Sequence, residues 1–256
     1  MKRTELVAFY MMGTALMIVM AVGFEHGLSH EGEQSAAATN QFDASRLQTG
    51  TFTYRDTVDG KAGSLSTSTI TLMPDGHYRF TADFPAFDQS WNTVTTRAMV
   101  PLQTTLKMRT RDGRHYQMDL TYAGQHVTGE AVTSASADGK LPGSDQSVTA
   151  DIPDDSVDQR VDWATVMTAD VKPGHVFDFK VYDAKTGVSR VSCSVSDAGM
   201  MQSALGTVHA VRLTYTVYKA SGTEVYTVYT SSAFPRAMLR EDLPGGLVTT
   251  LVGVSP

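Results

Sequence analysis

Residues 115–124 run His-Tyr-Gln-Met-Asp-Leu-Thr-Tyr-Ala-Gly, and their alternation indicates the fold class. Every second residue from Tyr116 to Tyr122 is large and mainly apolar, while the residues between are polar. Successive side chains of a strand point to opposite faces, so this pattern predicts a strand with one buried and one solvated face. Ala123-Gly124 then marks a turn, because glycine adopts the backbone conformation that hairpins require. Such half-buried strands are typical of antiparallel sheets.

The same alternation recurs along most of the chain, with turn signals such as Asp59-Gly60 and Ser221-Gly222 between the segments. Thr and Ser together make up about a fifth of the residues, and Thr favours half-exposed strands. We therefore expect a mainly β protein. Its buried faces would carry Tyr78, Phe80, Ala82 and Phe84; Phe177, Phe179 and Val181; Val191, Cys193 and Val195; and Val211, Leu213, Tyr215 and Val217.

One segment departs from this pattern. Asp154, Asp155, Ser156 and Asp158 are typical of a helix start, and Lys172-Pro173-Gly174 is typical of a stop. The spacing between them predicts one helix over about 156–170, with Val157, Val161, Ala164 and Thr168 on one stripe. An apolar stripe must lie on another apolar surface. The predicted fold is therefore a curved antiparallel sheet or half-barrel wrapping one central helix.

A curved sheet with an open mouth can hold an apolar ligand. Aromatic side chains from the helix and the inner strand faces would line such a cavity. The alternative is that these side chains simply fill the core. The candidate lining residues are Phe80, Phe84, Trp163, Phe177, Phe179 and Tyr215.

The N-terminus predicts export. Lys2 and Arg3 precede an uncharged run from Leu6 to Phe24, which is long enough for a membrane helix. We expect residues 1–24 to be a single-pass inner-membrane anchor, residues 25–45 a polar tether, and residues 46–256 one exported domain on the periplasmic side. The alternative is a cleaved signal segment and release to the periplasm.

Composition excludes several classes. A net charge of -6 and a pI of about 5.6 argue against a nucleic-acid partner. A single cysteine, Cys193, excludes an internal disulfide framework and any site with several cysteine ligands. Because Cys193 alternates with Val191 and Val195, we expect its thiol to point inward and to be unreactive.

No motif for catalysis, metal binding or a cofactor is found, so we expect neither an enzyme nor a bound metal or cofactor. The acidic group at 151–158 lacks the spacing of a calcium loop. His26 and His30 would face one another on a continuing helix and could hold a metal, although a solvated stretch explains them as well. Arg236 and Arg240 could contact an anionic headgroup, or could pair with Glu241 and Asp242.

Three stretches resemble a family of uncharacterised exported bacterial proteins. They are Thr53-Tyr54 through Gly60 and Gly63; Val176 through Asp183 with Thr186-Gly187; and Gly206 through Leu213 with Val228 through Ser231 and Pro235-Arg236. The resemblance implies an exported domain of unknown function and supplies no catalytic residues. The chain is also similar to the periplasmic lipoprotein carriers, half-barrels with a helical plug that hold acyl chains. It departs from them in its mid-chain helix and its predicted anchor.

Three functions are compatible with these features. The first is binding of a hydrophobic or lipid-like ligand beside the membrane. The second is a scaffold or assembly role, in which a sheet edge meets another envelope protein. The third is an enzyme that uses surface His and Asp residues, which the lack of a catalytic motif makes the weakest of the three.

Overall fold

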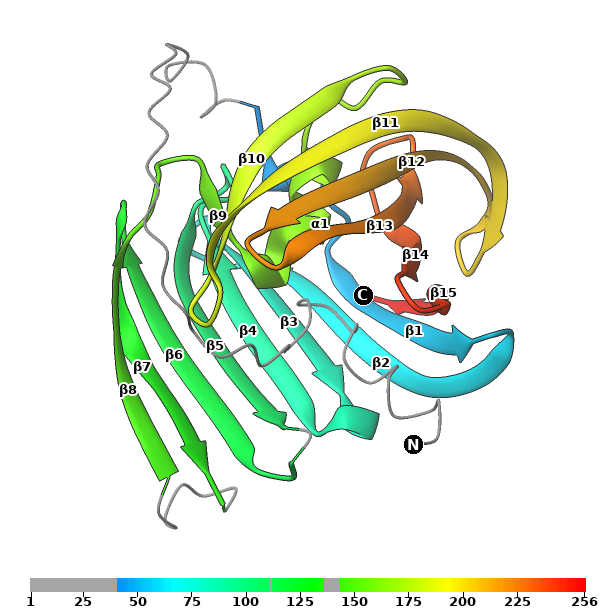
Figure 1. Ribbon diagram of the computed structural model, residues 1–256. Helices are drawn as coiled ribbons and strands as arrows, with labels where there is room; N and C mark the ends of the chain where they lie inside the picture. The colour runs from blue at the N-terminus through cyan, green and yellow to red at the C-terminus, as the bar shows by residue number, and fades with distance from the viewer. Residues whose placement is uncertain (1–40, 111, 136–142) are drawn as a thin grey trace.

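The computed structural model describes residues 41–256, apart from residue 111 and residues 136–142. In this part of the chain fifteen strands form one sheet around a short helical segment (Figure 1). The helical pieces are the 3-10 turns η4 Ala44–Arg46, η5 Pro85–Phe87, η6 Gln159–Val161 and η7 Val166–Thr168, and the α-helix α1 Asp162–Thr165. The strands are β1 Gly50–Val58, β2 Lys61–Leu72, β3 Tyr78–Phe84, β4 Gln89–Thr95, β5 Pro101–Arg109, β6 His115–Ala123, β7 His126–Ser134, β8 Gly143–Asp151, β9 Ser156–Asp158, β10 Val176–Asp183, β11 Gly187–Ser203, β12 Gly206–Lys219, β13 Gly222–Ser231, β14 Met238–Leu243 and β15 Leu247–Ser255.

The sheet follows the order of the chain in two meanders. One runs from β1 outward to β8, and the other runs from β15 outward to β9. The two meanders join where β1 pairs with β15, for example through Phe52 and Val254. All neighbouring strands in the sheet are antiparallel except β9, which runs parallel to β10. The predicted mainly β, antiparallel fold is confirmed.

The two edges of the sheet are β8 and β9, yet only residues 152–155 separate them in the chain. Five residue steps of extended chain reach at most about 18 Å. The edges must therefore return towards one another, so the sheet curls. Figure 1 shows β10 to β13 facing β3 to β8, with α1 between them.

The predicted helix over 156–170 is wrong in its extent. Residues 156–158 form β9, in which Val157 pairs with Val181, and α1 has only four residues. Asp158 accepts a hydrogen bond from the Arg160 backbone N–H at 2.8 Å and so begins the turn η6, later than the predicted start. Every residue from Ser156 to Ala169 is buried. The segment is covered on all sides, so a one-sided stripe could not define its conformation.

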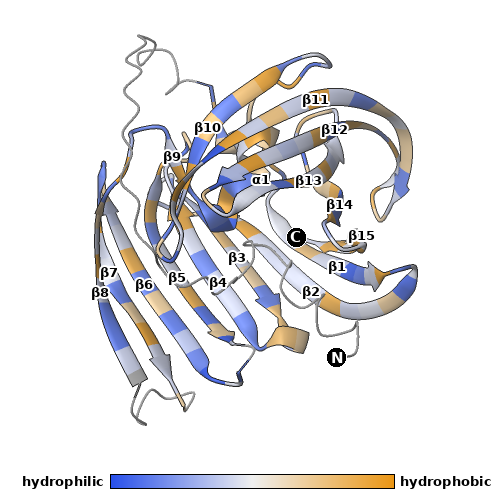
Figure 2. Cartoon of the chain, viewed as in Figure 1, coloured by the Kyte–Doolittle hydropathy of each residue, from blue (hydrophilic) through white to orange (hydrophobic). Residues whose placement is uncertain are grey.

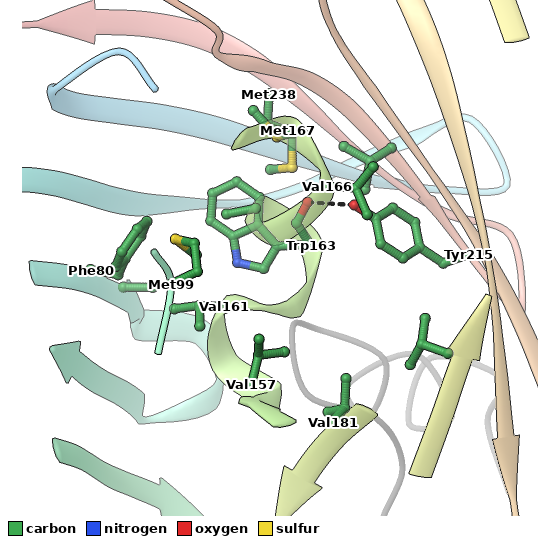
Figure 3. Close-up of a cluster of buried hydrophobic side chains, with 14 of the residues drawn as sticks. Phe80, Met99, Val157, Val161, Trp163, Val166, Met167, Val181, Tyr215 and Met238 are labelled. Atoms are coloured by element: carbon green, nitrogen blue, oxygen red, sulfur yellow. Dashed lines mark hydrogen bonds between the residues drawn. The ribbon is translucent and has the colours of Figure 1, made fainter. Parts of the chain in front are cut away.

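The core lies between this helical segment and the inner face of the sheet. Figure 3 shows Trp163 beside Met167, with Phe80 and Met99 approaching from the opposite half. The Tyr215 hydroxyl donates to the Trp163 carbonyl oxygen at 2.9 Å, which fixes α1 against β12. Each large apolar side chain buried here contributes roughly 1.5–3 kcal/mol to folding.

The strand faces follow the predicted alternation, as Figure 2 shows along β6. Tyr116, Met118, Leu120 and Tyr122 are buried, whereas Asp119 is exposed. The four sets of alternating residues named above for the other strands are buried in the same way, and Cys193 is among them. The pleat therefore sorts the side chains as the sequence indicates.

The predicted anchor at 1–24, and His26 and His30 in the tether, lie outside the described residues. Among the helices of the described part, none is both long and apolar enough to cross a bilayer.

Candidate functional site

A cleft of about 680 Å³ lies where the curled sheet fails to close. Five segments that are distant in the chain form its wall: the start of the described chain, the β4–β5 and β6–β7 turns, the β8–β9 connection and the unpaired side of β10. The lining residues are Gln41, Phe42, Ala98, Met99, Val100, Pro101, Gly124, Gln125, Ile152, Pro153, Asp154, Asp155, Ser156, Val157, Asp178, Phe179 and Lys180.

The floor of the cleft is apolar and continuous with the core. Phe42 packs edge to face on Phe179, with ring centroids 6.1 Å apart. Met99 and Val157, which Figure 3 shows on the core side, also line the cleft and are buried. Met99 has a φ of 64°, uncommon for a residue with a side chain. Its N–H donates to the Thr96 carbonyl oxygen at 3.0 Å, and this turn holds the thioether inward.

The rim is acidic. Lys180 Nζ lies 3.0 Å from Asp155 Oδ1, so the two charges neutralise one another. Asp154 and Asp178 are exposed, and no ion pair to either is found within the described residues. Two carboxylates thus remain uncompensated at the mouth.

Ser156 supplies a polar group inside the wall. The residue is only 4% exposed, and its hydroxyl has no hydrogen-bond partner in the described part of the chain. Its backbone N–H is satisfied, since it donates to the Pro153 carbonyl oxygen at 3.0 Å. A buried polar group without a partner is unfavourable by about 1–3 kcal/mol, so a ligand group that bonded to this hydroxyl would remove that cost.

A buried ionic network lies directly behind Ser156 and Val157. Arg160 donates to Asp183 Oδ2 at 2.6 Å and lies 3.5 Å from Asp158 Oδ1. The Tyr122 hydroxyl, from β6 in the opposite half, donates to Asp158. The network therefore joins β6 of one half of the sheet to β9 and β10 of the other.

The charges of this network hold one another. Burial is the largest influence on Asp183 and opposes its ionised form, but the Arg160 charge and the hydrogen bonds from Arg160 and from the Lys185 and Thr186 backbone together outweigh burial and lower the pKa of Asp183. Burial also opposes the charged form of Arg160, and Asp158 and Asp183 together raise the pKa of Arg160. Burial and the Asp158 charge raise the pKa of Tyr122, so its proton stays in the hydrogen bond.

A second buried polar group lies across β1, β15 and β14. Thr249 donates to Asp56 Oδ1 at 2.9 Å, and Glu241 stands opposite Thr249 in the register. Glu241 Oε2 is buried and has no hydrogen-bond partner among the described residues. Burial, with the charges of Asp162 and Asp56, raises the pKa of Glu241 to about 8. The sheet interior thus holds a carboxylic acid that keeps its proton at neutral pH.

Asp162, at the start of α1, faces the same interior. It accepts hydrogen bonds from the Trp163 backbone N–H at 2.7 Å and from the Tyr226 hydroxyl at 3.1 Å. These bonds favour the carboxylate, but burial outweighs them and raises the pKa of Asp162 to about 7. The Tyr226 ring stacks on the Tyr215 ring with centroids 4.6 Å apart, so Asp162 is connected through Tyr226 to Tyr215 on β12.

Residues 41–252 match the model of a family described as "Protein of unknown function (DUF3108)". The chain belongs to the DUF3108 family. This membership confirms the resemblance to a family of unknown function. The DUF3108 match spans all fifteen strands except the last residues of β15, so it includes every segment that lines the cleft.

Two solved structures are similar to this DUF3108 chain. One is a Bacteroides fragilis protein described as a candidate exported protein with a YmcC-like fold, at 10% identity and a TM-score of 0.33, covering 84% of this chain and 100% of the other. The other is a Parabacteroides distasonis candidate lipoprotein, at 10% identity and a TM-score of 0.32, covering 84% of this chain and 99% of the other. No curated protein gave a significant match.

The six predicted lining residues of the DUF3108 domain are all buried in one apolar cluster. Their exposed fractions run from 0% for Phe80 to 8% for Phe177. Only Phe179 of the six also lines the cleft. The structure therefore brings them together as core. The cleft opens beside them at the seam, the place where the curled sheet does not close between the β6–β8 side and β9–β10.

The two predicted anion contacts lie apart from the cleft. Arg236 is 2% exposed and donates to the carbonyl oxygens of Met167 at 2.8 Å and Ala169 at 2.6 Å, at the end of η7. Arg240 donates to both carboxylate oxygens of Asp242. Both guanidinium groups thus donate to acceptors of the chain itself. For Arg240 the acceptor is Asp242, one of the two acidic residues that the sequence offered as partners.

No sequence pattern indicates Ser156, Met99 or Phe42 as members of a site. Asp154 and Asp155 have the pattern of a helix start, but the structure places them in the connection between β8 and β9, where they line the cleft. In the described residues, no group of three or more His, Cys, Asp or Glu side chains is arranged to hold a metal ion.

Proposed function

We propose that this chain is a non-enzymatic binding protein of the cell envelope that holds a small hydrophobic or amphipathic molecule in the seam cleft. The observation that carries the proposal is the cleft itself. Its volume of about 680 Å³ falls in the range of small-molecule sites, and its floor is apolar. Its few polar groups lie at the rim and at Ser156, the arrangement that orients a ligand in such sites.

A binding role agrees with the chemistry of the lining better than catalysis does. A serine nucleophile needs a hydrogen-bonded base, and the Ser156 hydroxyl has no such partner among the described residues. Burial raises the pKa of the Cys193 thiol, which is 0% exposed and does not line the cleft. Location in the envelope is inferred from Lys2, Arg3 and the uncharged run to Phe24.

Titration of the full chain with N-phenyl-1-naphthylamine tests the proposal. This neutral dye fluoresces more strongly in apolar surroundings. We expect saturable binding of one dye per chain, weakened at least tenfold by Gln125→Trp, which places an indole at the cleft. Ala123→Trp is the matched control, because Ala123 is exposed two residues away and does not line the cleft. Absence of saturable binding, or equal binding by both variants, would refute the proposal.

One observation favours a second function, docking of another envelope protein on the edge strand β8. This strand has nine residues, pairs with β7 alone among the described strands, and exposes Gln146 and Ser147. Such an edge can accept a further strand. A photocrosslinker at Gln146 should trap one dominant partner in cells, whereas one at the exposed Thr128 of β7 should not. The same adducts from both positions would exclude edge docking.

A further inference from the structure

We propose that the ligand of the seam cleft is a primary ammonium amphiphile. Its alkyl chain lies on the apolar floor, and its head group is held by Ser156, Asp154 and Asp178. This inference rests on the proposed function and adds the chemical class of the ligand.

The charge of the rim selects a cation. Of the four charged residues that line the cleft, Lys180 is neutralised by Asp155, and Asp154 and Asp178 carry the excess negative charge. A carboxylate or phosphate head would meet two like charges without a free cation among the lining residues. An ammonium head would instead compensate both, and hydrogen bonds between ionised groups are about twice as strong as neutral ones.

The Ser156 hydroxyl is the second, independent feature. It is buried in the wall, lines the cleft and has no hydrogen-bond partner in the described residues. A hydroxyl oxygen accepts from N–H donors, and a primary ammonium carries three of them. The three donors of a primary ammonium thus match in number the Ser156 hydroxyl and the two rim carboxylates, whereas a quaternary ammonium has no donor to offer.

The floor accounts for the apolar part of the ligand. Phe42, Met99, Val157 and Phe179 form a continuous surface below the rim, and Met99 and Val157 connect it with the core. Methionine and aromatic side chains adapt to flexible alkyl chains through many weak contacts. An amphiphile fits both the floor and the rim, and a small polar amine would leave the floor uncovered.

Calorimetric titration of the full chain with dodecylammonium and with dodecanoate, each below its micelle concentration, tests the inference. The two probes share their alkyl chain, so their ratio isolates the head group. We expect dodecylammonium to bind at least tenfold more tightly. The double substitution Asp154→Asn and Asp178→Asn should remove this preference, and Ser156→Ala should weaken dodecylammonium about fivefold.

The matched control is Asp119→Asn with Glu130→Gln, which removes two exposed charges from paired residues of β6 and β7 that do not line the cleft. It should leave the preference intact. Equal affinity for both probes, or tighter binding of dodecanoate, would overturn the ammonium assignment while leaving the proposed function standing. Binding of neither probe nor the neutral dye would remove the proposed function as well. An unchanged affinity in Ser156→Ala would exclude Ser156 as the anchor.

Discussion

Glu241→Gln should stabilise the protein above neutral pH and have little effect in mild acid. Glu241 is 3% exposed on β14, and its pKa is raised from 4.5 to about 8 by burial and by the charges of Asp162, Asp56 and Asp242. The folded chain therefore holds a proton that the unfolded chain releases. Glutamine keeps the size of the side chain and cannot ionise.

The sign and the magnitude follow from linkage between protonation and folding. Between the unfolded pKa of 4.5 and the folded pKa of about 8, the folded state binds more protons, so its stability falls as the pH rises. Integrated from pH 5 to pH 8, one such group lowers the free energy of unfolding by about 3–4 kcal/mol. The pKa of Asp162 is raised in the same direction, and its carboxyl faces the same interior. The losses of stability from Glu241 and from Asp162 are therefore coupled rather than additive.

Urea denaturation at intervals from pH 5 to pH 9 measures this effect. We expect Glu241→Gln to be more stable than the native chain by roughly 3 kcal/mol at pH 8, with the difference shrinking towards zero at pH 5. The control is Asp119→Asn on β6, which is exposed and is not among the charges that raise the pKa of Glu241. It makes the same change of charge and should not follow this pH course. A Glu241→Gln difference that stays constant with pH would refute the reasoning.

Three further substitutions test the packing of the fold, each by urea denaturation at pH 7. Arg160→Met leaves Asp158 and Asp183 buried without their cation and should destabilise the fold by about 3–5 kcal/mol. Arg190→Met, at an exposed arginine, should change the stability little. Equal losses of stability in the two variants would contradict the network. Tyr215→Phe removes the hydrogen bond to Trp163 and should lower stability by about 1–2 kcal/mol, against no change in the half-buried Tyr229→Phe. Gly129→Ala should be strongly destabilising because the new Cβ would overlap the Asp119 carbonyl oxygen. Gly253→Ala, whose Cβ would make only ordinary contacts, should be tolerated. If Gly129→Ala is tolerated as well, the β6–β7 register is wrong.

The strands could be predicted from the sequence because each strand's pattern is local. Tyr116 to Tyr122 alternate, and the pleat alone determines which side chains face inward. The helix could not be predicted in this way. Val157 fits a helical stripe, yet its pairing with Val181 places it in β9, and this contact joins residues that no local pattern connects.

The cleft could not be predicted from the sequence, because it too depends on contacts between distant segments. Its lining comes from five segments between residues 41 and 180, which meet only after the sheet has curled. The aromatic residues proposed for a cavity lie on the inner faces and became core, because α1 and its flanking turns fill the space that they surround. Phe179 belongs to both groups, since it stands at the margin of the core where the seam begins.

The shortness of β9 explains why the cleft exists at this place. β9 pairs with β10 only at Lys180, Val181 and Tyr182, so among the described strands residues 176–179 of β10 have a neighbour on the β11 side alone. Asp178 and Phe179 on this unpaired stretch line the cleft, and so does Pro153, which has no N–H to extend the pairing. A longer β9 would cover β10 and close the seam. The connection that curls the sheet is thus also the connection that leaves the cleft open, and it places Asp154, and Ser156 directly after it in β9, at the opening.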